Sequence, residues 1–198
     1  MLSELAAKTK WKLFSLEGGP VAAEALSKGS QGLEVNLRQA IGIPEMLQGF
    51  DFVYLGDGLQ RFREPRVTLR TLAILLNPGG FLFLSTPNLD SEQRKLFGPA
   101  WARWQPNEHR FIYSKRSLIK LLTQAGFSLI KLRTDSHLES TKLSLKNLNA
   151  RYALDGGREV RSETLRGMPA EEIARMSQLL WDKLGSGDET LAIFRRDF

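Results

Sequence analysis

Imidazole and thiol groups, which often carry acid–base and covalent chemistry, are scarce, because the sequence holds two histidines and no cysteine. The absence of cysteine excludes disulfides, thiolate metal sites and a cysteine nucleophile, and two histidines cannot build a histidine-rich metal site. We therefore predict no metal centre. His109 stands near Trp104, Phe111 and Tyr113, and an imidazole that titrates near neutral pH suits it to deprotonate or orient a substrate. A single histidine among aromatic residues is equally compatible with a role in loop packing.

Apolar periodicity predicts the elements that must position these side chains. The predicted strands cover residues 11–16, 32–36, 50–55, 81–85, 127–133 and 189–195. The predicted helices cover residues 1–9, 20–28, 65–76, 114–125 and 169–184. Strands that alternate with helices along the chain are typical of an α/β domain, doubly wound, with a mostly parallel sheet and helices on both faces.

Two short segments follow predicted strands at their carboxyl ends. Glu17 comes directly after the strand at 11–16, and Leu55, Gly56 and Asp57 close the strand at 50–55. In an open α/β sheet, ligands bind outside the carboxyl ends of the strands, which makes these residues binding candidates. Gly56 permits a close approach of the backbone, although a glycine also serves a simple turn. Glu17 is equally compatible with a solvent-facing turn.

Two longer segments do not follow the alternation. Residues 86–114 are rich in proline, asparagine and aromatic side chains, which predicts an ordered and functional loop. We expect its aromatic residues to be buried, namely Phe97, Trp101, Trp104, Phe111 and Tyr113. Residues 135–166 are polar and give no single interpretation. The helix at 169–184 is expected to bury one face, made of Ile173, Met176, Leu179, Leu180 and Leu184.

Several motifs follow one another in a fixed order. They are Phe50–Leu55, Leu76–Leu84 with its Asn-Pro-Gly-Gly turn, Thr86-Pro87-Asn88, Trp104, Glu108–Ser114 and Gln124–Phe127. In this order and spacing they resemble the central part of class I S-adenosylmethionine-dependent methyltransferases of the small-molecule type, over about residues 10–134. The resemblance implies a Rossmann-like methyltransferase fold whose last strand, near residues 187–194, runs antiparallel to its neighbours.

The resemblance also implies the roles of the candidate residues. The cofactor is S-adenosylmethionine, with Glu17 on its ribose and Leu55, Gly56 and Asp57 along its methionine side. Trp104 and Tyr113 are implied to bind the substrate, and His109 is the candidate catalytic residue. The segment at residues 59–65 departs from the family pattern, since the acid and histidine common there are replaced by Gln60 and Arg61.

The front of the family pattern has no counterpart. Residues 1–9 match the helix that follows the family's glycine-rich loop, and Gly18-Gly19 comes after the ribose position, so the glycine-rich loop is absent. We expect residues 1–198 to form a single truncated methyltransferase-like domain with its first strand missing and a variable helical insertion at about 135–185. The strands beside the gap would close up directly, or a homodimer or a partner chain would complete the sheet.

Three functions remain open from the sequence. They are a methyltransferase acting on a small-molecule acceptor and impaired by the absent loop, a catalytically inactive partner-binding module, and a basic nucleic-acid-binding module. The net charge of +6 would attract nucleic acid, but the charges are spread along the chain, which argues against that reading. No apolar run is long enough to span a membrane and no signal pattern opens the chain, so the expected location is cytoplasmic.

Overall fold

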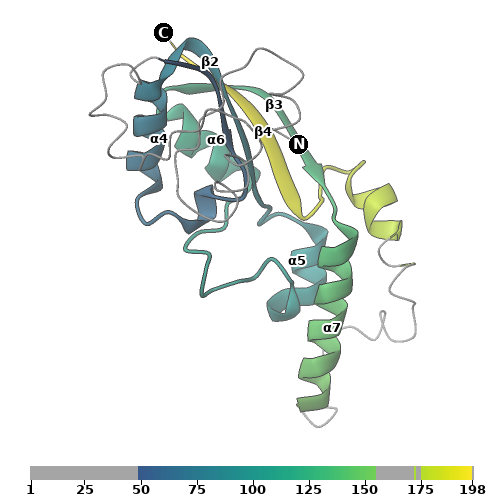
Figure 1. The fold of residues 1–198 in the computed structure, drawn as a ribbon. Helices are drawn as coiled ribbons and strands as arrows, with labels where there is room; N and C mark the ends of the chain where they lie inside the picture. The colour runs from purple at the N-terminus through teal and green to yellow at the C-terminus, as the bar shows by residue number, and fades with distance from the viewer. Residues whose placement is uncertain (1–48, 155–171, 173–174, 198) are drawn as a thin grey trace, which may run out of the picture.

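The computed structural model describes residues 49–154, 172 and 175–197 (Figure 1). Glu17, the strands predicted at 11–16 and 32–36, the helices predicted at 1–9 and 20–28 and the expected gap in the sheet lie outside the described residues. Among the described helices, none combines the length and the apolar character needed to cross a membrane.

The described strands form one four-stranded sheet in the order β1, β2, β4, β3. β1 (Phe50–Leu55) pairs in parallel with β2 (Leu76–Pro87). β4 (Glu189–Arg196) lies between β2 and β3 (Phe127–Asp135) and runs antiparallel to both. β1, β2 and β3 therefore share one direction, which confirms the predicted mostly parallel sheet with an antiparallel last strand.

The turn predicted at Asn77–Gly80 is a bulge inside β2. Helix α4 (Pro65–Leu75) ends at Leu75, one residue earlier than predicted, and β2 begins at the next residue. Phe50 pairs with Leu76 but Phe52 pairs with Phe81, so the intervening residues of β2 leave the ladder. Gly79 in the bulge has a φ of +77°, a conformation that favours glycine.

Helices α4 and α6 (Lys115–Thr123) lie on the same side of the sheet (Figure 1). Their buried leucines pack against the inner face of the strands, in a core of Val53, Leu69, Leu72, Leu82, Leu84, Leu118, Leu122, Phe127, Ala192 and Phe194. Ser114 caps α6 as predicted, because its Oγ accepts the N–H of Ser117 at 3.1 Å. On the opposite face of the sheet, Phe52, Tyr54 and Phe81 are 43%, 40% and 42% exposed.

A second packed unit adjoins the carboxyl edge of the sheet (Figure 1). It consists of α5 (Glu92–Phe97), the short turn η3 (Gly98–Ala100) and α7 (Leu138–Leu154), around a small core of Phe97, Ala100, Trp101, Leu145 and Leu148. The region predicted to hold a helical insertion at about 135–185 thus contains α7 and the π-helical turn η5 (Ser177–Trp181). Periodicity did not predict α7, whose buried positions include the polar Thr141 and Ser144.

Two burial predictions are wrong. Phe97, Trp101 and Tyr113 are buried as expected, but Trp104 is 48% and Phe111 42% exposed because both line surface hollows. The apolar face predicted for residues 169–184 is exposed at each of its four described members, which are Met176, Leu179, Leu180 and Leu184. Neither of the two apolar cores formed by the described residues includes them.

Candidate active site

The carboxyl ends of β1 and β2 lie side by side, since Leu55 pairs with Leu84 in the parallel ladder. The chain then turns at Asp57, which has a φ of +36° and whose N–H donates a hydrogen bond to Ser85 Oγ at 3.0 Å. The predicted residues Leu55, Gly56 and Asp57 are all half-buried here. They form a rim at the edge where α/β folds bind ligands.

Gly56 has a structural reason to be glycine. A Cβ at this position would lie 2.5–2.6 Å from the ring and hydroxyl of Tyr54, which is closer than packed atoms allow. The Tyr54 ring is itself held by stacking on Phe83, with ring centroids 5.4 Å apart. Gly56 therefore leaves room for the side chain of Tyr54, which belongs to β1.

Gln60, in the short helical turn η2 (Leu59–Arg61), ties the rim to the long loop that follows β2. Its buried side-chain amide donates to the main-chain oxygen of Asp57 at 2.8 Å and to the Asp57 carboxylate at 2.5 Å, while its Oε1 accepts the Thr86 hydroxyl at 3.2 Å. Its main-chain oxygen accepts the N–H groups of Arg110 and Phe111, at 2.8 and 3.2 Å. Gln60 thus fixes the rim through its side chain and the loop through its main chain, although the sequence marked this position only as a departure from the family pattern.

Arg103 joins three carboxylates from two segments of the chain. Its guanidinium lies 3.5 Å from Asp188, 3.6 Å from Glu189 and 3.9 Å from Asp57. Asp188 is fully buried, and its other oxygen accepts the main-chain N–H of His137 at 2.9 Å. A buried carboxylate needs such partners, because desolvation without them is costly.

His137 and Glu189 form the tightest ion pair of this edge, with Nε2 and Oε2 2.5 Å apart. The hydrogen bond with Glu189 raises the pKa of His137, against the opposing effect of burial. Burial alone would raise the pKa of Glu189, but the hydrogen bond from His137 and the charge of Arg103 outweigh it and lower that pKa. The pair therefore favours the charged state of both groups.

His109 also contacts Arg103, but its surroundings favour the neutral ring. It is 7% exposed, its Nδ1 is 3.1 Å from the main-chain oxygen of Arg103, and its Nε2 has no hydrogen-bond partner among the described residues. Burial lowers the pKa of His109, which keeps the ring neutral at pH 7. With a proton on Nδ1 donated to the carbonyl oxygen, Nε2 carries the free lone pair.

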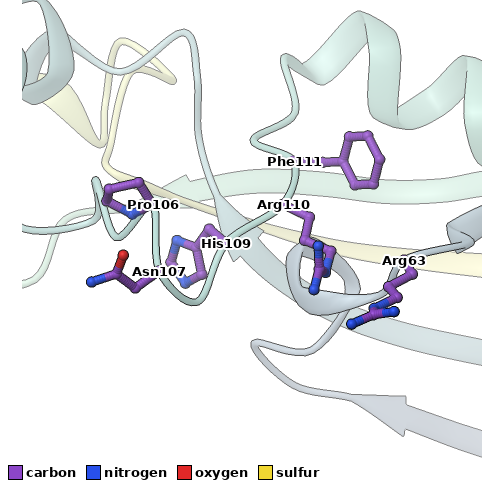
Figure 2. A pocket seen from close by; sticks show the side chains of 6 residues that line it. All are labelled: Arg63, Pro106, Asn107, His109, Arg110 and Phe111. Carbon is purple, nitrogen blue, oxygen red and sulfur yellow. The ribbon is translucent and has the colours of Figure 1, made fainter.

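Two adjoining surface hollows open over this loop. The first, of about 730 Å³, is drawn in Figure 2 and is lined by Arg63, Pro106, Asn107, His109, Arg110 and Phe111. The second, of about 320 Å³, shares Pro106, His109, Arg110 and Phe111 with it and adds Leu89, Trp104, Gln105 and Ile112. Trp104 and His109 thus face the hollows as substrate-contacting candidates would.

Tyr113 lies elsewhere. Its ring belongs to the core under the sheet, it lines neither hollow, and its hydroxyl has no hydrogen-bond partner within the described ranges. Burial raises the pKa of Tyr113 to about 12. Its link to the hollows runs through Phe111, whose ring centroid is 6.2 Å away.

Sequence reasoning placed Asp57 and His109 at one site, and both contact Arg103 in the structure. It missed Gln60, Arg103, His137, Asp188 and Glu189. A signal for the last two was present, since Asp188 and Glu189 directly precede the predicted last strand. An antiparallel strand between β2 and β3 begins at their carboxyl edge, which puts its first residues beside the ligand site.

The sheet order and the polar side chains at its carboxyl edge define the fold of a class I methyltransferase. An S-adenosylmethionine-dependent methyltransferase of Thermotoga maritima superposes with a TM-score of 0.58 at 18% identity, over 97% of this chain and 76% of that one. A structure from Haloferax volcanii, the complex of the Trm112 methyltransferase activator with a methyltransferase, gives a TM-score of 0.61 at 14% identity, over 100% of this chain and 77% of that one. At these identities the likeness shows the fold.

Sequence comparison then shows the family. The methyltransferase-domain family model matches residues 6–132, and this chain belongs to that family, the S-adenosylmethionine-dependent methyltransferases. The tRNA U34 carboxymethyltransferase of Desulfotalea psychrophila is 31% identical over 114 residues, which make up 58% of this chain and 35% of that protein. The chain thus spans about a third of the length of this curated relative. S-adenosylmethionine is the cofactor of the family, as the motifs implied.

Proposed function

We propose that this protein transfers the methyl group of S-adenosylmethionine to an oxygen, nitrogen or carbon atom of a small-molecule acceptor. The observation that carries the proposal is the connection made by Gln60 between the rim at Asp57 and the loop that carries Trp104 and His109. A donor bound on the rim and an acceptor bound on the loop are held next to each other by this connection. Methyl transfer by in-line displacement depends mostly on such positioning.

The rim fits the methionine side of the donor. The Asp57 side chain is 42% exposed, so its carboxylate is accessible to an ammonium group, and the half-buried main chain of Leu55 and Gly56 offers hydrogen-bonding groups beside it. In this proposal Glu17, outside the described residues, binds the ribose hydroxyls. The bound donor supplies an electrophilic methyl group on its sulfonium.

His109 is proposed as the residue that accepts the proton released by the acceptor. Its lowered pKa leaves the ring neutral. The contact of Nδ1 with the Arg103 carbonyl leaves the lone pair of Nε2 without a partner among the described residues, just beneath the surface of the hollows that His109 lines. Trp104 is proposed to contact the acceptor directly. Tyr113 is proposed to act from beneath, by supporting the Phe111 ring.

Donor binding tests this proposal directly. We expect calorimetry to detect S-adenosylhomocysteine binding, and we expect Asp57→Asn to weaken it by about tenfold, the effect of losing one charge-assisted hydrogen bond. Asp51→Asn is the matched control, because Asp51 lies near the opposite end of β1, where its carboxylate accepts a hydrogen bond from the Asn77 amide at 2.7 Å. Equal affinities for the two variants would contradict the assignment of the rim.

A second candidate, a catalytically inactive partner-binding module, is favoured by the exposure of Phe52, Tyr54 and Phe81 on one face of the sheet. A homodimer or a partner chain would cover this face, and light scattering of the purified protein tests for the former. A complete lack of S-adenosylhomocysteine binding would favour this module. The cytoplasmic location stays a prediction from the sequence.

A further inference from the structure

The two hollows over the loop form one continuous surface with two different chemistries. Arg63 and Arg110 come from separate segments and line the first hollow, as Figure 2 shows. Trp104 lines the second, and Phe111 belongs to both. A ligand that spans the surface meets cationic groups at one end and aromatic rings at the other.

The two arginines are available for a ligand. Neither guanidinium has a hydrogen-bond or ion-pair partner in the part of the chain that the structure describes, although the main-chain N–H of Arg110 is bonded to Gln60. Their neighbours are paired: Arg61 bonds Glu108 at 2.6 Å, and Arg103 is held by Asp188 and Glu189. Glu108, the acid of the same loop, therefore does not neutralise Arg110. Two guanidinium groups at one hollow match the geometry of a phosphate.

The aromatic rings are equally available. Trp104 is 48% and Phe111 42% exposed, although large aromatic side chains are usually buried. Exposed rings next to unpaired arginines are the combination with which proteins bind nucleotides, because the base stacks on a ring while the phosphate contacts the cations. An aliphatic or purely anionic ligand would use only one of the two chemistries.

We propose that this surface binds a nucleotide, with its base against Trp104 and Phe111 and its phosphate between Arg63 and Arg110. Gln60 connects this surface to the rim. The bound nucleotide is therefore either the methyl acceptor itself or the part of a larger acceptor that anchors it to the protein. This last step rests on the proposed methyltransferase function, whereas nucleotide binding itself does not. The nucleotide is either a free molecule or one unit of an RNA chain.

Calorimetry with pyrimidine compounds tests the proposal, since a purine could occupy the adenosine site of the donor. The probes are uridine, uridine 5′-monophosphate, inorganic phosphate and a single-stranded ten-nucleotide oligouridylate, each with S-adenosylhomocysteine in excess. We expect the monophosphate to bind at least tenfold more tightly than uridine or phosphate alone.

Variants of the two ends of the surface test the two chemistries separately. Trp104→Ala should weaken binding of the monophosphate by about tenfold through lost stacking. The double variant Arg63→Gln/Arg110→Gln should abolish the preference over uridine. The control of equal charge change is Arg70→Gln/Arg151→Gln, which replaces two exposed arginines in α4 and α7.

The oligouridylate separates the two sources of the nucleotide. Binding of the oligomer but not of the monophosphate would support an RNA acceptor, and the Arg63→Gln/Arg110→Gln variant should then reduce the slope of log affinity against log salt by about 1.4. Equal affinity per site for both probes would support a free nucleotide. Binding of phosphate as tight as the monophosphate, or binding unaffected by the arginine and tryptophan changes, would overturn the proposal. Because S-adenosylhomocysteine binding is measured separately on the same variants, loss of nucleotide binding alone is distinguishable from failure of the donor site.

Discussion

Two regions of the molecule are held together by different means. The unit formed by the sheet, α4 and α6 is packed with apolar side chains, and Leu69, Leu122 and Phe194 are completely buried in it. The unit of α5, η3 and α7 has a smaller apolar core and adds buried hydrogen bonds to it, from Gln93 Nε2 to Thr141 at 3.0 Å and from the N–H of Ala102 to Ser144 at 2.8 Å. The candidate site lies between the two regions. Stability in the first depends on filled volume, and in the second it depends on satisfied polar groups as well.

The largest expected effect is a cavity in the apolar region. Leu122→Ala removes a completely buried side chain of α6 and should lower the free energy of unfolding by about 3 kcal/mol, from lost transfer free energy and the cavity left behind. The midpoint of urea denaturation measures this loss. Leu143→Ala is the matched control in α7, where the leucine is 46% exposed, and it should cost under about 0.5 kcal/mol. A comparable loss in both variants would refute the placement of the core.

A smaller effect is expected for a hydroxyl in the polar region. Ser144→Ala leaves the buried N–H of Ala102 without an acceptor and should cost about 1–2 kcal/mol, although it removes a single oxygen. Hydrogen exchange at the Ala102 amide should accelerate with the same variant. Ser140→Ala, one turn earlier in α7, is the control, because the Ser140 hydroxyl has no hydrogen-bond partner in the described part of the chain. If Ser144→Ala is as harmless as that control, the polar packing contributes nothing to stability.

This contrast explains which parts of the molecule could be predicted. Leu118 and Leu122 are four residues apart and follow the cap at Ser114, so periodicity and capping together predicted α6. α7 was missed because Thr141 and Ser144 occupy its buried side, and a helix that buries hydroxyls has no apolar stripe to detect. Trp104 was expected inside, because a sequence pattern does not distinguish an aromatic residue that packs from one that lines a hollow.

The rim of the candidate site was predictable because it follows a single strand. Leu55, Gly56 and Asp57 end β1, and the general rule for α/β sheets places such residues at the ligand edge. Arg103 could not be found in this way, because its partners Asp57, Asp188 and Glu189 come from distant parts of the sequence. Only the fold brings these charges together, and no short sequence motif predicts their contact.

The smallest expected effect is the pH dependence of the free energy of unfolding, which should differ between variants of His137 and of His109. The raised pKa of His137 means that its pairing stabilises the protein fully below about pH 6.5 and is lost as the pH rises through the raised value. The lowered pKa of Glu189 adds stability that is present above about pH 4.5 and is lost as the pH falls through the lowered value. The pair therefore contributes most between about pH 4.5 and 6.5. Because the His137 side chain is 46% exposed, His137→Gln should cost at most about 1 kcal/mol at pH 6 and almost nothing at pH 9.

His109 should show the opposite trend, because burial lowers its pKa and protonation therefore favours the unfolded chain. Replacing it by glutamine should reduce the loss of stability that the protein suffers as the pH falls below about 6.5, where an unfolded histidine takes up its proton. Urea denaturation of both variants from pH 5 to pH 9 measures the two trends together. If His137→Gln cost the same at pH 6 and pH 9, the charged pair with Glu189 would not form in solution, and Glu189 would have Arg103 as its positively charged neighbour.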